Sequence, residues 1–175
     1  MVPGYMGTGP EHWQTHWEHA NPAIQRVEQD HWNRPERSAW VSRLDEYIGK
    51  DPNDTILVAH SLGCSTVAAW AAQNAGSRVA GALLVAPADL DRIDLVAELR
   101  LFGPMPLNPL PFKSIVVASD NDPYVTLDRA RHFADRWGST LIPIGACGHI
   151  NSDAGFGPWP EGKAILATLI QEVST

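Results

Sequence analysis

The sequence predicts an α/β protein built on a mostly parallel, doubly wound sheet of about six strands, sandwiched between two layers of helices. Short apolar runs alternate along the chain with longer segments of helical periodicity. The short runs are apolar at successive positions, which is typical of strands covered on both faces. The 175 residues suffice to bury the core of one three-layer unit, so we expect a single domain over 1–175.

Four apolar runs predict the central strands, at 55–59, 80–86, 114–119 and 139–144. A weaker run at 24–28 predicts a further strand. A first strand is expected before the glycine-rich turn that starts at Gly4, yet only three residues precede that turn, where strands usually have about five or six. Either this first strand is short or the start of the chain is trimmed.

Helical periodicity fills the segments between these strands. Apolar residues three or four positions apart predict helices around 40–48, 127–137 and 165–173, and a run that is apolar almost all round predicts a buried helix over 62–75. The prolines between 102 and 112 are too dense for a helix or a central strand. We expect an ordered excursion there, at the carboxyl end of the 80–86 strand.

The most informative segment runs from the 55–59 strand through a sharp turn, Ala59-His60-Ser61-Leu62-Gly63, into the buried helix. It matches the G-x-S-x-G nucleophile elbow, with alanine in place of the first glycine. Small flanking residues are needed because the serine backbone is strained and closely packed. The elbow lifts the serine Oγ clear of the backbone and aims helix N–H groups at a developing oxyanion. Ser61 is therefore predicted to be a nucleophile; alternatively, it only caps the helix.

Hydrolases with this elbow carry an acid and then a histidine after later strands. The 139–144 strand is followed by His149, which we expect to be the base that accepts the Ser61 proton. The 114–119 strand is followed by Asp120 and Asp122. Asp122 lies deeper in the loop and is favoured as the acid that orients His149, with Asp120 as the alternative. A third interpretation is that both aspartates cap the next helix, which begins near Thr126.

Two backbone N–H groups are expected to form an oxyanion hole. One belongs to Leu62, the residue after the nucleophile, and the other to Tyr5, which follows Gly4 in the first turn. Met6 is the alternative to Tyr5. His60, next to the nucleophile, is expected to be structural, because adjacent side chains at a sharp turn usually diverge.

His12 and His16 stand four residues apart in the first helix, a spacing that can bind zinc. Neither a third ligand nor the glutamate of an H-E-x-x-H motif accompanies them. We therefore expect this segment to pack the first helix, and we expect no metal and no other cofactor.

Composition and charge bear on the class of partner. The formal net charge is −7, and lysine and arginine do not cluster, so no nucleic-acid partner is expected. No stretch reaches the roughly 20 apolar residues of a membrane span, and no signal peptide is evident, so no membrane partner is expected. Cys64 and Cys147 form no disulfide framework, which together with the acidic charge predicts a cytoplasmic protein.

These motifs together resemble the small α/β-hydrolases of the retinoblastoma-binding-protein-nine and YdeN group, in its bacterial branch. The resemblance rests on Val-Pro-Gly-Tyr at 2–5, His-Trp at 12–13, Ala-His-Ser-Leu-Gly at 59–63, Asp-Asn-Asp-Pro at 120–123, Gly-His-Ile-Asn at 148–151 and the tail 152–162. It spans nearly the whole chain and implies an α/β-hydrolase fold with little or no lid. It also implies a triad of Ser61, Asp122 and His149, and esterase activity on small acyl substrates. Members of the group usually have a fuller first strand.

The sequence thus predicts a serine hydrolase, and in the first place a carboxylesterase that cleaves small or short-chain acyl esters through an acyl-enzyme. One alternative is a thioesterase or transacylase that uses the same three residues. Another is a protein-interaction module on a hydrolase scaffold, in which these residues are not used. The fold alone does not choose among them.

Overall fold

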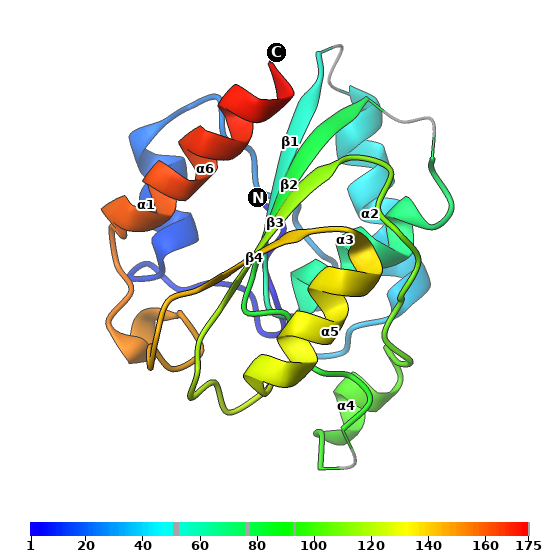
Figure 1. The fold of residues 1–175 in the computed structure, drawn as a ribbon. Coiled ribbons are helices and arrows are strands. Elements are labelled where there is room, and N and C mark those ends of the chain that lie inside the picture. The colour runs from blue at the N-terminus through cyan, green and yellow to red at the C-terminus, as the bar shows by residue number, and fades with distance from the viewer. Residues whose placement is uncertain (51–52, 76–77, 93, 175) are drawn as a thin grey trace.

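The computed structural model describes residues 1–50, 53–75, 78–92 and 94–174 (Figure 1). At its centre is a parallel sheet in the order β1 (Thr55–His60), β2 (Val79–Val85), β3 (Lys113–Ala118) and β4 (Thr140–Pro143). Each of these strands begins and ends within one residue of the apolar run that predicts it. Because all four run in the same direction, their carboxyl ends meet at one edge of the sheet.

Helices cover both faces of the sheet, as predicted. One face carries α1 (Trp13–Ala20) and α6 (Pro160–Val173), and the other carries α2 (Arg37–Lys50), α3 (Leu62–Ala71) and α5 (Leu127–Trp137) (Figure 1). Along β2, Leu83 and Val85 join the core under α1 and α6, whereas Leu84 joins the core under α2, α3 and α5. Successive residues of a strand therefore enter opposite cores, which explains the continuous apolar runs.

The remaining segments are short or irregular. The proline-rich segment 102–112 forms neither helix nor strand and follows the single-turn helix α4 (Ala97–Arg100). It is anchored to α5, where Trp137 Nε1 donates to Pro106 O at 2.8 Å. The 3₁₀ turn η1 (Ser152–Ala154) precedes α6. The helix predicted over 62–75 is shorter than expected, because α3 ends at Ala71 and the chain then turns.

The described residues form four regular strands rather than about six, because the two N-terminal strands are reduced to a few backbone contacts. Val2 N–H donates to Val58 O at 2.8 Å, and His60 N–H donates to Val2 O at 3.1 Å, which makes a single parallel bridge to β1. The segment predicted as a fifth strand is extended but irregular, and its Val27 N–H donates to Met1 O at 2.9 Å. The first strand is short, as expected. The prediction of a strand at 24–28 was wrong, because its short neighbour at the N-terminus offers few pairing groups.

A groove of about 600 Å³ lies beside the amino-terminal half of β1, lined by residues of α2 and α6. It flanks residues 55–58 of β1. On this edge of the sheet, Val2 pairs with β1 by a single bridge near the carboxyl end of that strand. Ser61 follows the opposite end of the same strand. The groove therefore lies apart from the three side chains predicted to carry the chemistry.

No helix in the described part of the chain is both long enough and apolar enough to cross a bilayer.

Candidate active site

The turn between β1 and α3 holds Ser61 in a strained backbone conformation. Its φ is 55° and its ψ is −121°, and residues other than glycine rarely adopt a positive φ. Ser61 occupies the N-cap position of α3, but its side chain makes no capping hydrogen bond, so the interpretation that it serves only as a side-chain cap is wrong. Its Oγ instead lies 2.9 Å from Nε2 of His149.

Two glycines let the first strand pack directly against this turn. A Cβ on Gly63 would lie 2.1 Å from Val2 O, and a Cβ on Gly4 would lie 2.8 Å from Cβ of Ser61. Real Cβ atoms essentially never come this close to other heavy atoms. Glycine at the last position of the elbow motif is therefore required by contact with the N-terminal segment.

His149 connects Ser61 to a buried carboxylate. Its Nδ1 lies 2.8 Å from Oδ2 and 3.0 Å from Oδ1 of Asp122, whose side chain is fully buried. An ionised carboxylate only accepts hydrogen bonds, so Nδ1 carries the ring proton. With the ring proton on Nδ1, Nε2 is the acceptor that faces the Ser61 hydroxyl. The structure thus brings Ser61, His149 and Asp122 into one hydrogen-bonded series.

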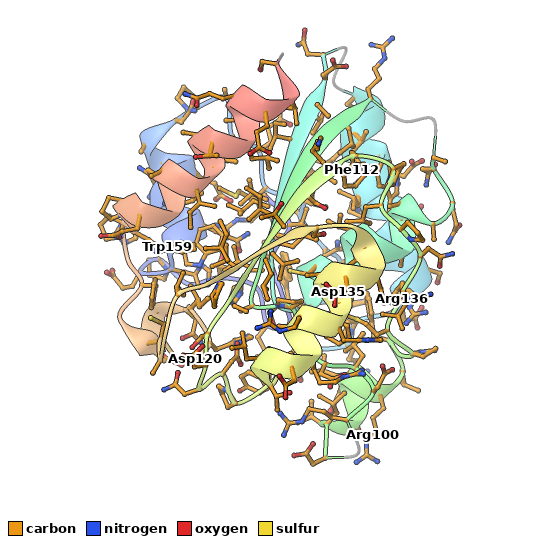
Figure 2. The ribbon with its side chains drawn as sticks, in the orientation of Figure 1. Arg100, Phe112, Asp120, Asp135, Arg136 and Trp159 are labelled. Atoms are coloured by element: carbon orange, nitrogen blue, oxygen red, sulfur yellow. The ribbon has the colours of Figure 1, made fainter. Side chains whose placement is uncertain are left out.

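Asp120, the alternative acid, lies at the surface of the same loop (Figure 2). Its backbone N–H donates to Gly145 O at 2.9 Å, and it is Asp122 that contacts His149. Neither aspartate caps α5, because the Thr126 side chain does so by accepting from Arg129 N–H. The third interpretation of these aspartates is therefore wrong.

Asn121 and Ser119 join the loop of the acid to the loop of the base. Asn121 Oδ1 accepts from Gly148 N–H at 2.7 Å and from the Ser119 hydroxyl at 2.9 Å. Ser119 Oγ in turn accepts from Cys147 N–H at 2.8 Å. Neither role was predicted from the sequence. The available signal was their place just beyond β3, where side chains can reach the loop that follows the adjacent strand.

The two N–H groups predicted for the oxyanion hole are free of partners in the part of the chain that the structure describes. Neither Leu62 N–H nor Tyr5 N–H donates a hydrogen bond there, whereas Met6 N–H donates to Trp32 O at 3.0 Å. Leu62 N lies only 3.3 Å from the position that a Cβ on Gly4 would take. Glycine at position 4 therefore keeps space open beside Leu62 N–H, and Met6 is less suited than Tyr5 to the second position.

His12 and His16 serve different contacts. His12 Nδ1 accepts from Gln14 N–H and so caps α1, and burial lowers the pKa of His12 to about 4. His16 Nε2 lies 3.9 Å from a Glu11 carboxylate oxygen. The side chain of His12 is thus committed to the start of α1, in line with the packing role expected for this segment.

Comparisons with known proteins identify the family. The chain matches the family model described as serine hydrolase over residues 1–168. A YdeN-like hydrolase from Pectobacterium atrosepticum has a similar structure, with a TM-score of 0.87 and 34% identity over 98% of this chain and 89% of that chain. The ydeN gene product of B. subtilis has a TM-score of 0.75 and 20% identity, over 97% of this chain and 96% of that one.

A more distant structure, Est1E from Butyrivibrio proteoclasticus with ferulic acid bound, has a TM-score of 0.71 and 12% identity over 99% of this chain and 88% of that one. At this identity the similarity shows the fold alone. A search of the curated proteins gives no match. From the family match and the YdeN-like structures, we conclude that the chain belongs to the serine hydrolase family and is an α/β hydrolase of the YdeN type.

Proposed function

We propose that this serine hydrolase is a carboxylesterase that cleaves small or short-chain acyl esters, with Ser61 as nucleophile, His149 as general base and Asp122 as the orienting acid. The observation that carries the proposal is the series of hydrogen-bond distances from Ser61 Oγ through both ring nitrogens of His149 to Asp122. A nucleophile, a base and a group that orients the base are the elements of this chemistry.

In the first half of the reaction, Ser61 Oγ attacks the ester carbonyl carbon while its proton passes to Nε2 of His149. Asp122 stabilises the imidazolium that forms. The negative charge moves to the carbonyl oxygen, where the N–H groups of Leu62 and Tyr5 donate hydrogen bonds. His149 then gives its proton to the leaving alcohol oxygen, and the bond between that oxygen and the acyl carbon breaks.

In the second half, water attacks the acyl group held on Ser61. One water proton passes to His149 Nε2, and a second oxyanion forms in the same position. The bond from the acyl carbon to Ser61 Oγ then breaks, and Oγ takes the proton back from His149. The carboxylic acid leaves, and no metal or organic cofactor enters any step.

The preference for small substrates is supported by the small amount of regular structure between β2 and β3. Within the described part of this connection the only regular element is the single turn α4, and the segment 102–112 is tied down on α5. A connection with so little regular structure offers little apolar cover for a long acyl chain, whose binding would depend on buried area. Short acyl groups need less of such cover.

Three other expectations remain predictions. They are a single domain over 1–175, the lack of a nucleic-acid partner, and a cytoplasmic location. Cys64 and Cys147 are both free thiols in the structure.

The experiment that tests the proposal is hydrolysis of p-nitrophenyl acetate, butyrate and octanoate by the wild type, Ser61→Ala and His149→Ala. We expect turnover that is fastest with the shorter acyl groups. Each variant should lose activity by about 10³-fold or more while remaining folded. His132→Ala, a histidine on the exposed side of α5, is the matched control and should keep wild-type activity.

Two results would favour the alternatives. A wild type that turns over no ester and does not react with a fluorophosphonate probe would favour the interaction module. A wild type that prefers a thioester over the ester of the same acyl group would favour a thioesterase.

A further inference from the structure

The turn that carries His149 has a strained backbone immediately after the base. Ile150 has a φ of 50°, and a β-branched residue in that region is a true outlier. Gly148, just before the base, also has a positive φ, of 57°. Such a conformation persists only where the surrounding structure holds it in place.

Two buried side-chain donors hold the two peptide groups on either side of Ile150. His60 Nε2 lies 2.9 Å from His149 O, and Trp13 Nε1 donates to Ile150 O at 2.9 Å. Neither donor is more than 5% exposed. Consecutive carbonyl groups of the strained turn are therefore bonded to two separate elements, the end of β1 and the start of α1.

The donor role of His60 follows from its surroundings. A carbonyl oxygen only accepts, so Nε2 of His60 carries a proton. Its ring lies against the rings of His12 and His149, with centroids 4.8 Å away in each case, and edge-on to Trp13 at 6.0 Å. Burial lowers the pKa of His60 well below its ordinary value, so the ring is neutral and the proton on Nε2 is its single N–H.

Trp13 is equally constrained. Its ring packs edge-on against Trp17 at 4.8 Å and against Trp159 at 5.2 Å, where Trp159 lies just before α6 (Figure 2). These ring contacts fix the orientation of the indole, so that its N–H points at Ile150 O.

We propose that His60 and Trp13 are positioning residues, whose hydrogen bonds to the carbonyls of His149 and Ile150 fix the base turn and thereby aim the His149 ring at Ser61. This inference depends on the proposed function, because it assigns these side chains an effect on the same reaction. Neither residue touches the reacting atoms. His60 is covalently next to Ser61, so one peptide segment determines the place of the nucleophile and, through its imidazole, the place of the base.

The test compares kcat and KM for p-nitrophenyl acetate in matched variants. His60→Leu removes the donor at similar volume, whereas His60→Gln keeps an N–H donor at the reach of Nε2. We expect kcat of His60→Leu to fall by about 10- to 100-fold with KM changed by less than about twofold, because small displacements of a reacting group act on the chemical step. His60→Gln should recover most of this loss.

Trp13→Phe removes the second donor and should lower kcat by about tenfold. Trp17→Phe is the control, because Trp17 is as deeply buried on the same helix and its Nε1 donates to Pro158 O at 2.9 Å, outside the base turn. The two changes remove the same atoms from the same core, so their difference isolates the bond to Ile150. This pair tests the role of Trp13 even if His60→Leu fails to fold, and His60→Gln then tests the role of His60.

The outcomes separate this inference from the proposed function. If the wild type is inert, or Ser61→Ala is equally active, the proposed function fails. If Ser61→Ala is inactive while His60→Leu keeps wild-type kcat, the function stands and the positioning role of His60 is wrong. Equal losses in Trp13→Phe and Trp17→Phe would likewise refute the role of Trp13.

Discussion

Replacing Gly63 with alanine tests whether the nucleophile elbow depends on direct backbone contact with the N-terminal segment. The added Cβ would lie 2.1 Å from Val2 O and 2.8 Å from Pro3 O. Both neighbours are backbone atoms, so no side chain can rotate out of the way. Residues 2 and 3 would have to move by about 1 Å to restore an ordinary contact.

The expected loss of stability combines two opposed effects. Alanine in place of a helical glycine gains about 0.5–1 kcal/mol. Overpacking costs about 1–3 kcal/mol, and contact with rigid backbone favours the upper end of that range. We therefore expect Gly63→Ala to lose about 2 kcal/mol. In a chain of this size, that loss lowers Tm by about 4–8 °C.

The assay is urea unfolding followed by tryptophan fluorescence, with Gly49→Ala as the matched control. Gly49 also lies in a helix and is exposed, and a Cβ added to it would meet nothing within 4 Å. Its replacement should therefore be neutral or stabilising by up to about 1 kcal/mol. If Gly63→Ala proves as stable as Gly49→Ala, the elbow does not depend on this contact and the reasoning is refuted.

Three further changes have defined outcomes. Asp122→Asn should lower kcat by about 10³- to 10⁴-fold, because the amide no longer fixes the His149 tautomer, whereas Asp120→Asn should leave ester turnover near the wild-type rate. His12 has a folded-state pKa of about 4, below its value in the unfolded chain. The unfolded chain therefore binds more protons than the folded one between about pH 6.5 and 4. As a result, the free energy of unfolding falls as the pH drops through that window. His12→Asn keeps an acceptor for the α1 cap and should reduce this dependence in urea titrations at several pH values, while the lowered pKa of buried His60 still acts in the same direction. An unchanged slope would contradict the assignment. Arg129→Met leaves buried Asp89 without the two hydrogen bonds that Arg129 donates to it, at 2.8 and 3.0 Å, and should cost about 2 kcal/mol in the same unfolding assay.

The features that depend on nearby residues could be predicted from the sequence. The four regular strands follow from apolar runs, because most residues of a strand buried on both faces are apolar. The elbow at Ser61 follows from a strand, a turn and a helix that are consecutive in the chain. His149 could be selected because it is the only histidine after the 139–144 strand.

Features that depend on contacts across loops could not be settled in this way. Asp120 and Asp122 are two residues apart in one loop, and which of them reaches His149 is a matter of loop conformation. The segment 24–28 has only Ile24 and Val27 as apolar residues, and whether it forms a regular strand depends on the length of its neighbour, Met1 and Val2. Asn121 and Ser119 are ordinary polar residues in the sequence, and only their bonds to the base loop distinguish them.

The elbow motif is informative because its consecutive residues meet different parts of the fold. His60 bonds to the base turn, Ser61 N–H donates to Val85 O of β2 at 3.0 Å, and Gly63 lies against the carbonyl of Val2. Each of these contacts restricts the residue type at its own position, independently of the chemistry at Ser61 Oγ. A change at position 60 or 63 should therefore displace the base or the N-terminal turn while leaving the nucleophile itself intact. The segment Ala-His-Ser-Leu-Gly thus reflects the packing of three neighbouring segments as well as the presence of a nucleophile.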